Sequence, residues 1–492
     1  MEGISYWIGK WAYLRGEKTA IITDQESITY KELNERINRA AGKLQQELKV
    51  STGERVAILS QNRMEYIILL FATAKIGAVA VPLNIRLSAS ELVFQLMDSG
   101  TKVIAADEEH VPLAKGLLRD TKAETVLALD ELLDGPLLSL HEEKNVSAPF
   151  IICYTSGTTG KPKGAVLTQE NMFWNAVNNT LAVELTSDDR SIVLLPLFHI
   201  GGIGLFALPT LFAGGTIVIP GKFDPEKTLE MIEEHRVTIV MGVPTIHQAL
   251  LHSPSFDGTD LSSVRWFYNG GAPCPHELIT AFLERGFLFG QGFGMTETSP
   301  TVFMLMKEDA RRKIGSIGKP VMFNDFKLMG ADGQTCRPGE VGELTVRGAN
   351  VMKEYWNRPD ATKETIVDGW LHTGDLARVD EEGFVYIVGR KKEMIISGGE
   401  NIYPLEVEQV INQIEDVEEV AVVGAADPRW GEVPVAFIVK KKGSSLGEEG
   451  VLGHCTSQLA RYKLPKVITF LEELPKNATG KIQKTQLVRS GS

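Results

Sequence analysis

The sequence predicts an α/β protein with a large amino-terminal region of parallel-sheet subdomains and a β-rich subdomain, followed by a small α+β domain on a hinge. Short apolar runs alternate with helical periodicity through roughly the first 300 residues. Short alternations broken by turns replace that pattern over residues 324–388, and a new unit begins after Gly389. At 492 residues the chain exceeds one compact core, so two or more domains are expected.

The amino-terminal region begins its alternation with an apolar strand at 56–59, a helix at 61–75 and a second strand at 78–83. Strand, helix, strand is the order that builds a parallel sheet. The same order predicts further strands at 102–106, 125–129, 150–154, 192–195, 237–241 and 264–268, and helices from Thr168 and at 225–235, 245–251 and 275–285.

The carboxyl-terminal unit follows a short charged segment, Arg390-Lys391-Lys392-Glu393. Helices are expected there at 404–413 and 448–461, and strands at 419–424 and 434–440. A short charged connection between two compact units suits a hinge. We therefore place the boundary at Lys392, giving domains 1–391 and 392–492.

Composition limits the function classes. Lys and Arg number 51 against 63 Asp and Glu, and the net charge of −12 disfavours nucleic acids and anionic membranes as partners. The four cysteines stand far apart without metal-binding spacing, which indicates a reduced, cytoplasmic compartment, and Cys153 reads as a small buried hydrophobe. The first 20 residues have no signal-peptide core. The sequence leaves the oligomeric state open, a homodimer included.

One uncharged stretch, residues 191–221, is long enough to span a bilayer. Pro196, Pro209, His199 and the glycines at 201, 202, 204, 214 and 215 interrupt it, and its ends at 192–195 and 216–219 resemble strands. We therefore expect a buried strand, a Gly-rich turn and a helix that line a dry interior, and no integral membrane segment. Plain core remains the alternative.

Residues 154–164, Tyr-Thr-Ser-Gly-Thr-Thr-Gly-Lys-Pro-Lys-Gly, follow an apolar strand and predict a phosphate-binding loop. Glycines let the backbone approach an anion, while hydroxyls and lysines donate hydrogen bonds and charge. The spacing is not that of a Walker A loop, because only two residues separate Gly157 from the Gly-Lys pair and a proline follows. The candidate ligands are Thr155, Ser156, Gly157, Thr158, Thr159, Gly160, Lys161 and Lys163.

Four further sequence motifs are less specific. In Gln-Gly-Phe-Gly-Met-Thr-Glu-Thr, residues 291–298, Phe293 offers a flat face for a nucleobase, Thr296 a phosphate donor and Glu297 a hard ligand for Mg²⁺. Asp375 in Thr-Gly-Asp suits ribose hydroxyls, although turn residues of this kind are common. The others are the basic, then glycine-rich segment 389–404 and Lys481, which by itself would be a solvated charge.

In this order the motifs resemble those of the ANL superfamily of adenylate-forming enzymes, in its acyl/aryl-CoA synthetase branch. The resemblance covers almost the whole chain. It implies an acid–CoA ligase that uses ATP, Mg²⁺ and coenzyme A and forms an acyl-adenylate. It also implies that the loop at 155–163 binds the β- and γ-phosphates, Glu297 binds Mg²⁺, Thr296 contacts the α-phosphate and Lys481 bridges to the reacting carboxylate.

The same resemblance implies a substrate-adjacent His199, a hinge at Lys392 and roles for the remaining motifs. Phe293 stands where the family often has Tyr, which keeps the stacking face but loses a hydroxyl. Asp375 and Arg390 would bind the ribose, and paired glycines would flank the pantetheine passage. The residues implied to line the adenine, acyl and pantetheine sites are Gly270, Gly271, Ala272, Gly292, Phe293, Gly294, Gly398 and Gly399.

The small-molecule acid is less well determined. Residues 198–213 contain no acidic side chain that could pair with an amino acid's ammonium, and the wall after His199, with Tyr268 and Val302 nearby, is apolar and expected to be roomy at its glycines. A medium- to long-chain fatty acid is the first expectation and an aryl acid the alternative. A dicarboxylate ranks lower, because only Arg265 is near as a second cation. A non-catalytic scaffold or nucleotide-binding protein is the rival of a different class.

Overall fold

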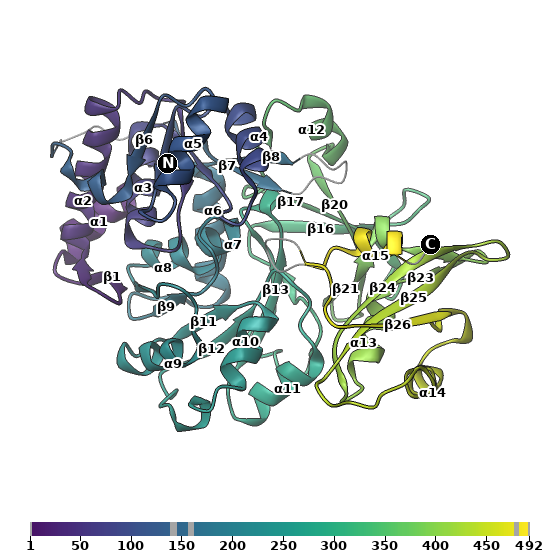
Figure 1. Ribbon diagram of the computed structural model, residues 1–492. Coiled ribbons are helices and arrows are strands. Elements are labelled where there is room, and N and C mark those ends of the chain that lie inside the picture. The colour runs from purple at the N-terminus through teal and green to yellow at the C-terminus, as the bar shows by residue number, and fades with distance from the viewer. Residues whose placement is uncertain (1, 138–144, 156–161, 477–481, 491–492) are drawn as a thin grey trace.

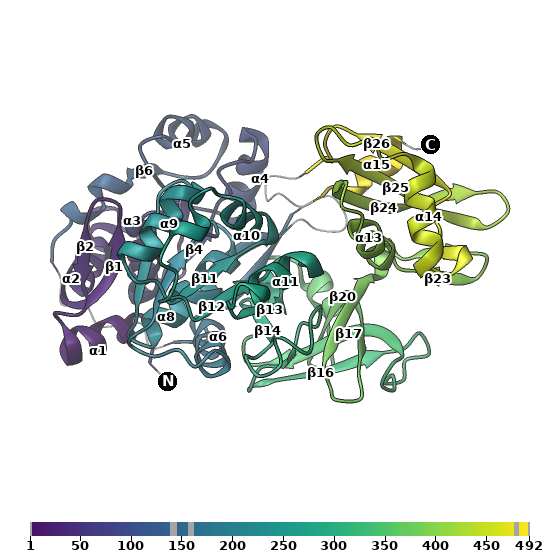
Figure 2. The same cartoon turned by 90° about the horizontal axis from the view of Figure 1, so that it is seen from below.

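The computed structural model describes residues 2–137, 145–155, 162–476 and 482–490. Figures 1 and 2 show two α/β layers formed by the amino-terminal part, a β-rich layer that includes β16, β17 and β20, and a carboxyl-terminal unit beyond it. The α/β class, the β-rich subdomain and the small final unit are thereby confirmed. The exact domain boundary at Lys392 stays a prediction.

One amino-terminal sheet has the strand order β18-β8-β7-β4-β3-β5-β6. Its central strands pair in parallel, and their continuous burial explains the apolar runs in the sequence. The strands are β3 (Arg55–Leu59), β4 (Val79–Pro82), β5 (Val103–Ala106), β6 (Thr125–Ala128), β7 (Pro149–Thr155), β8 (Lys163–Thr168) and β18 (Glu354–Tyr355). The sequence prediction missed β8, which pairs antiparallel with β7 and places Lys163 in a strand.

The other amino-terminal sheet has the order β15-β14-β13-β12-β11-β9-β10-β1-β2. Strands β9 to β13 and β1 run parallel, so their carboxyl ends meet at one edge. Its strands are β1 (Thr19–Thr23), β2 (Ser27–Thr29), β9 (Arg190–Val193), β10 (Thr216–Ile219), β11 (Ile239–Gly242), β12 (Trp266–Asn269), β13 (Phe289–Gly294), β14 (Thr301–Met304) and β15 (Lys319–Pro320).

Local sequence signals set the helix starts. Thr29, Ser88 and Thr168 each form a capping box with the residue three positions on, which satisfies amide groups that the first helical turn leaves open. The helices of the amino-terminal sheets are α1 (Ser5–Arg15), α2 (Tyr30–Gly42), α3 (Met64–Ile76), α4 (Ala89–Ser99), α5 (Val111–Leu117), α6 (Gln169–Ala182), α7 (Ile200–Gly202), α8 (Leu208–Phe212), α9 (Pro225–Glu234), α10 (Pro244–Leu251) and α11 (His276–Glu284).

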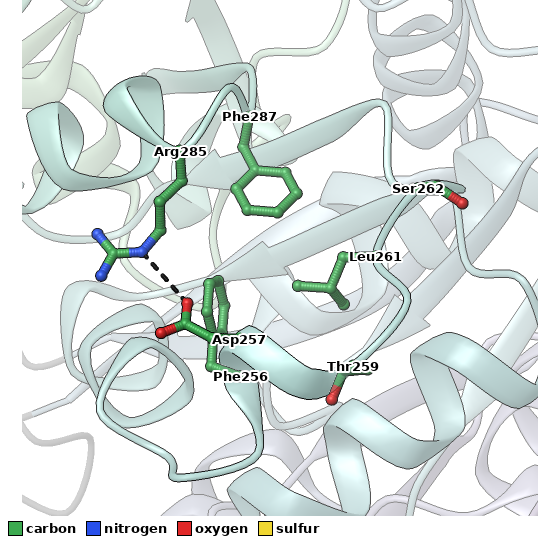
Figure 3. A pocket seen from close by; sticks show the side chains of 7 residues that line it. All are labelled: Phe256, Asp257, Thr259, Leu261, Ser262, Arg285 and Phe287. Atoms are coloured by element: carbon green, nitrogen blue, oxygen red, sulfur yellow. Dashed lines mark ion pairs between the residues drawn. The ribbon is translucent and has the colours of Figure 1, made fainter.

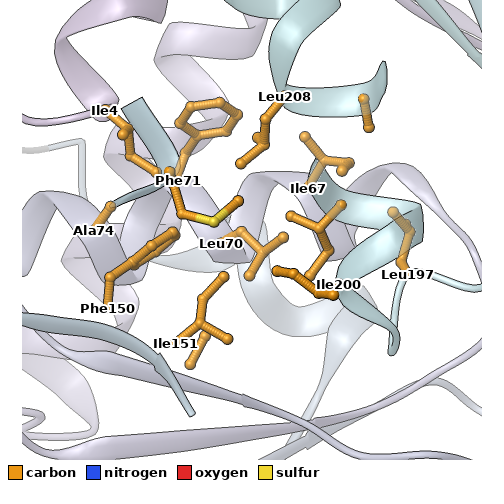
Figure 4. Packing of buried hydrophobic residues seen from close by; sticks show 14 of the residues in the cluster. Ile4, Ile67, Leu70, Phe71, Ala74, Phe150, Ile151, Leu197, Ile200 and Leu208 are labelled. Carbon is orange, nitrogen blue, oxygen red and sulfur yellow. The ribbon is translucent and has the colours of Figure 1, made fainter. Parts of the chain in front are cut away.

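The main core lies where the two amino-terminal sheets meet. Figure 4 shows Ile67, Leu70 and Phe71 of α3 packed between β7 and the segment that holds α7 and α8. Every residue of α3 except Glu65 is buried, so this helix serves both sheets. The uncharged stretch 191–221 supplies β9, α7, α8 and β10 to this interior, as expected. None of the helices described is long and apolar enough to cross a membrane.

The β-rich layer has the order β16-β17-β20-β19, with β21 paired to β20. Its elements are β16 (Asn324–Met329), β17 (Val341–Gly348), α12 (Pro359–Thr365), β19 (Ile366–Val367), β20 (Trp370–Val379) and β21 (Val385–Arg390). After a single 3₁₀ turn, Lys391–Glu393, the final unit begins. It contains β22 (Ile395–Ser397), β23 (Glu400–Ile402), α13 (Pro404–Asn412), β24 (Val417–Asp427), β25 (Gly431–Lys440), α14 (Glu448–Gln458), β26 (Val467–Leu471) and α15 (Lys484–Ser490).

Candidate active site

The carboxyl edge of the parallel strands β9, β11, β12 and β13 collects most of the predicted site. His199 follows β9, residues 270–272 follow β12, and residues 292–297 end and follow β13. In open α/β sheets this edge is where ligands bind. The fold therefore brings together segments that lie up to about a hundred residues apart in sequence.

The segments predicted to line the adenine site, residues 270–272 and 292–294, are closely packed. Gly270 faces the side chains of Met241 and Leu205, and a Cβ there would lie 2.7 Å from Met241 Cε. A Cβ on Gly292 would lie 2.7 Å from the Phe303 carbonyl oxygen. Gly271 has φ of +83°, a conformation that glycine adopts without strain, and the Asn269 amide closes the turn on the Ala272 carbonyl at 2.9 Å.

Phe293 is partly buried, and its ring packs edge-on against Phe303 with centroids 6.2 Å apart. The ring is thus packed against the core, and the residue remains partly exposed. Gly294 lies so close to the Pro300 carbonyl that any side chain would collide with it. The Phe293 segment is therefore held rigidly against the loop that follows Glu297.

Glu297 lies in a 3₁₀ turn, Thr296–Thr298, and is buried. The hydroxyl of Tyr355 donates a 2.7 Å hydrogen bond to Oε1 of Glu297. Burial, and then the charge of Glu297, raise the pKa of the Tyr355 phenol, so it stays a donor. Sequence reasoning missed Tyr355, because it comes to Glu297 only through the long-range pairing of β18 with β8.

The two strands that flank the predicted phosphate loop, β7 and β8, lie close to Tyr355 and Glu297. Thr155 and Lys163 face each other in the β7–β8 register, and the Lys163 ammonium lies 5.1 Å from the centre of the Tyr355 ring. Six predicted loop residues lie outside the described residues: Ser156, Gly157, Thr158, Thr159, Gly160 and Lys161. Lys481 also lies outside them. Cys153, next to the loop, is buried, and burial raises the pKa of its thiol to about 12, as expected for an unreactive core cysteine.

Buried asparagines connect the segment after His199, which is predicted to line the acid site, to the loop that follows Glu297. Asn175 of α6 donates to the Gly204 carbonyl at 2.6 Å and accepts from the Thr301 amide at 3.1 Å. Asn350 donates to the carbonyls of Thr298 and Thr301 at 2.8 and 2.6 Å. Isolated asparagines carry no sequence signal for such a network, so it too was missed.

The wall after His199 differs from its expected form. Gly202 and Gly204 are filled by backbone: a Cβ on Gly204 would lie 2.6 Å from the Ser299 carbonyl oxygen, and Gly202 packs on the Pro196 carbonyl. These glycines serve close packing rather than open space, because two chain segments cross there. Only Gly201 meets ordinary contacts, with Leu195 and Leu205 at 3.6 Å.

Two other wall candidates are core residues. Phe206 and Tyr268 pack edge to face with centroids 5.9 Å apart, and the Tyr268 hydroxyl donates to the Gln291 carbonyl at 2.9 Å. Val302 is also fully buried. These side chains therefore support the wall from within the core and do not form its surface.

Arg265 forms an ion pair with Asp189. Its guanidinium binds Asp189 through Nε at 2.7 Å and through a second nitrogen at 3.0 Å, and it donates to the Val183 carbonyl. It also precedes β12, at the end of the strand opposite residues 270–272. Arg265 thus has a structural partner at the far edge of the sheet.

In the β-rich layer, Asp375 and Arg390 are cross-strand partners and form an ion pair with Nε and Oδ1 2.6 Å apart. Lys392 is exposed in the 3₁₀ turn between β21 and β22. Gly398 and Gly399 form the turn between β22 and β23, with φ of +60° and +89°. Both views place β23, the strand after this turn, apart from β13 (Figures 1 and 2).

Two surface cavities lie outside this cluster. One of about 240 Å³ contains none of the predicted site residues and is lined by Phe256, Asp257, Thr259, Leu261, Ser262, Arg285 and Phe287 (Figure 3). It lies before β12 and β13, at their amino ends. The other, of about 460 Å³, has an acidic lining that includes Asp24, Glu65 and Asp107, which disfavours a polyphosphate.

Comparisons with known proteins agree with this geometry. The model of the AMP-binding enzyme family matches residues 9–356, and that of the AMP-binding enzyme C-terminal domain matches residues 406–481. A feruloyl-CoA synthase from an Amycolatopsis species is 44% identical, covering 99% of both chains.

Solved structures give the same result. The o-succinylbenzoate CoA synthetase of Bacillus subtilis, bound to its acyl-adenylate, is 36% identical with a TM-score of 0.90, covering 99% of this chain and 98% of that one. It has also been solved with ATP and a magnesium ion. A Mycobacterium tuberculosis fatty acyl CoA synthetase is 35% identical with a TM-score of 0.81 and the same coverage.

Proposed function

The chain belongs to the AMP-binding enzyme family and is an AMP-forming acid–CoA ligase that uses ATP, Mg²⁺ and coenzyme A, and from this premise we propose that its acid is an aryl monocarboxylic acid of the feruloyl type. The observation that carries the proposal is the 44% identity with a feruloyl-CoA synthase across essentially the whole of both chains. This replaces the fatty acid as first choice.

The ion pair that Arg265 forms with Asp189 favours a substrate with a single carboxylate. A dicarboxylate such as o-succinylbenzoate would need a second cation beside its distal acid group. The candidate that the sequence offers, Arg265, is bound to Asp189 at the opposite end of β12. The wall after His199 carries no charged side chain, which suits an aromatic ring better than a second carboxylate.

A fatty acid is the second candidate, favoured by the uncharged wall and by the likeness to a fatty acyl CoA synthetase. The close packing at Gly202 and Gly204 weighs against it, because backbone occupies space that a long chain would need. A planar acid needs less depth along that wall.

The first half-reaction is the attack of the substrate carboxylate on the α-phosphate of ATP, which forms acyl-adenylate and releases pyrophosphate. We assign Phe293 to the adenine face, Asp375 and Arg390 to the ribose, and Thr296 to the α-phosphate. The loop at 155–163 and Lys481 would neutralise charge as pyrophosphate leaves. A magnesium ion held by Glu297 would supply further positive charge at the phosphates.

In the second half-reaction the thiol of coenzyme A attacks the acyl carbonyl, AMP leaves, and the thiol proton passes to solvent. We propose that residues 392–492 rotate about Lys392 between the two steps. The exposure of Lys392 in a single turn between two sheets supports a hinge there, and rotation would carry the Gly398–Gly399 turn toward the site. Four free cysteines support a reducing, cytoplasmic location.

The test is release of AMP and pyrophosphate with a panel of acids, from acetate through palmitate to benzoate and ferulate, with and without coenzyme A. We expect CoA-dependent AMP formation to be greatest with ferulate or benzoate. Greatest activity with palmitate would favour the fatty-acid candidate. ATP binding without turnover of any acid would favour a non-catalytic nucleotide-binding protein.

A further inference from the structure

We propose that Tyr355 is a positioning residue for the metal–nucleotide site, where its hydroxyl holds the Glu297 carboxylate and its ring lies beside the Lys163 ammonium. One side chain would thereby set the distance between the metal ligand and a cation of the phosphate loop. The inference rests on the proposed roles of Glu297 and Lys163.

The contacts of the Tyr355 side chain carry the first step. Its hydroxyl lies 2.7 Å from Glu297 Oε1, and both side chains are buried, at 7% and 5% exposure. A hydrogen bond to a charged group in a dry site is stronger than one between neutral groups. The Lys163 ammonium, 5.1 Å from the ring centre, lies within the range of a cation–π contact.

The backbone around Tyr355 is held from both directions. It pairs with Ala165 in β8, two residues beyond Lys163, and its amide donates to the Thr362 hydroxyl at 2.9 Å. The Met352 amide donates to the Glu297 carbonyl at 2.8 Å. Because β18 pairs with β8 and Met352, just before it, binds the Glu297 turn, the Tyr355 phenol has little freedom to move.

A single buried carboxylate fits magnesium bound to a nucleotide. Mg²⁺ usually takes one or two protein carboxylates and fills its octahedron with phosphate oxygens and water. The described residues contain no group of three or more His, Cys, Asp or Glu that could form a complete metal cage. With so few protein ligands, the orientation of Glu297 decides the geometry, and an outer partner that fixes it gains importance.

The test is Tyr355→Phe, which removes the hydroxyl and keeps the ring beside Lys163. Binding of Mn²⁺ is measured by electron paramagnetic resonance in the presence of an ATP analogue with a methylene between the α- and β-phosphorus. We expect Mn²⁺ affinity to fall about tenfold while binding of the metal-free analogue is unchanged. Tyr386→Phe is the matched control, since Tyr386 lies in a different sheet, the β-rich layer, where its hydroxyl is 3.5 Å from Asp380.

A cycle with Glu297→Gln separates the inference from the site assignment. If Tyr355 acts through Glu297, adding Tyr355→Phe to Glu297→Gln causes no further loss of Mn²⁺ affinity. Unchanged affinity in Tyr355→Phe, with a loss in Glu297→Gln, overturns the inference alone. Unchanged affinity in Glu297→Gln overturns the metal-site assignment, and the inference with it.

Discussion

Nε of Arg390 lies 2.6 Å from Oδ1 of Asp375, and the two residues face each other across the β20–β21 pair. The ion pair fixes the carboxylate that we assign to the ribose hydroxyls. Thr373 adds to this, because its hydroxyl accepts from the Asp375 amide at 3.0 Å and donates to the Leu344 carbonyl at 2.7 Å. Asp375 is therefore oriented before nucleotide binds.

Replacing Asp375 with Asn should raise the KM for ATP by about tenfold to a hundredfold, the value of one hydrogen bond to a charged group. The preference for ATP over 2′-deoxy-ATP, measured as a ratio of kcat/KM values, should also shrink. Asp325→Asn is the control, since Asp325 pairs with Arg347 at 2.7 Å across neighbouring strands. An unchanged preference in Asp375→Asn would remove this residue from the ribose site.

Arg265→Met should lower the free energy of unfolding at pH 7 by about 2 kcal/mol, less than for a fully buried pair because Arg265 is one-third exposed. Burial would raise the pKa of Asp189, but hydrogen bonds, first that from Arg265, hold the pKa below 3.8. A depressed pKa gives stability that is complete above pH 3.8 and is lost as pH falls below it. The variant's deficit should therefore shrink in acid.

Denaturant unfolding at pH 7 and pH 3 measures that difference directly. The preference among acids should be unchanged in Arg265→Met, because the residue lies at the far edge of the sheet from residues 270–272. A changed acid preference would mean that Arg265 reaches the substrate after all.

Gly204→Ala should destabilise the protein by about 1 to 3 kcal/mol and raise the KM for the acid, because its Cβ would meet the Ser299 carbonyl at 2.6 Å. Gly201→Ala is the matched control, with side-chain contacts at 3.6 Å in the same segment. Thermal unfolding and acid KM together measure the effect. Equal stability and equal acid KM in the two variants would show that the segment has the open space predicted from the sequence.

Lys481→Ala should abolish acyl-adenylate formation while sparing thioester formation from supplied acyl-adenylate. The charge of this lysine is needed where pyrophosphate leaves and is not needed when the thiol attacks. Pyrophosphate release and acyl-CoA formation are measured separately, with Lys442→Ala, an exposed lysine, as the control. Equal loss of both half-reactions would argue against this division of labour.

Local pattern was enough to predict the elements that hold the site. The apolar runs before residues 154 and 270 are buried strands, as predicted. Thr168 caps its helix, as its hydroxyl and the spacing of Asn171 allow. Strand β8 was missed because its first residues, Lys163 and Gly164, belong to the glycine-rich sequence that predicts a loop.

The partners of the site residues could not be predicted from pattern. Tyr355 stands 58 residues from Glu297, and only the pairing of β18 with β8 brings them together. The wall glycines were misread for a related reason: a glycine can mark open space or a crossing of two backbones, and only the position of the Ser299 segment decides which.

Competition between ferulate and palmitate in one reaction with ATP, Mg²⁺ and coenzyme A tests the central claim most directly. The two acyl-CoA products are separated by chromatography, and their ratio at equal acid concentrations gives the ratio of kcat/KM values. We predict that feruloyl-CoA exceeds palmitoyl-CoA by at least about a hundredfold, the discrimination expected of a pocket whose shape fits one acid and not the other. A ratio near one, or an excess of palmitoyl-CoA, would contradict the assignment of an aryl acid.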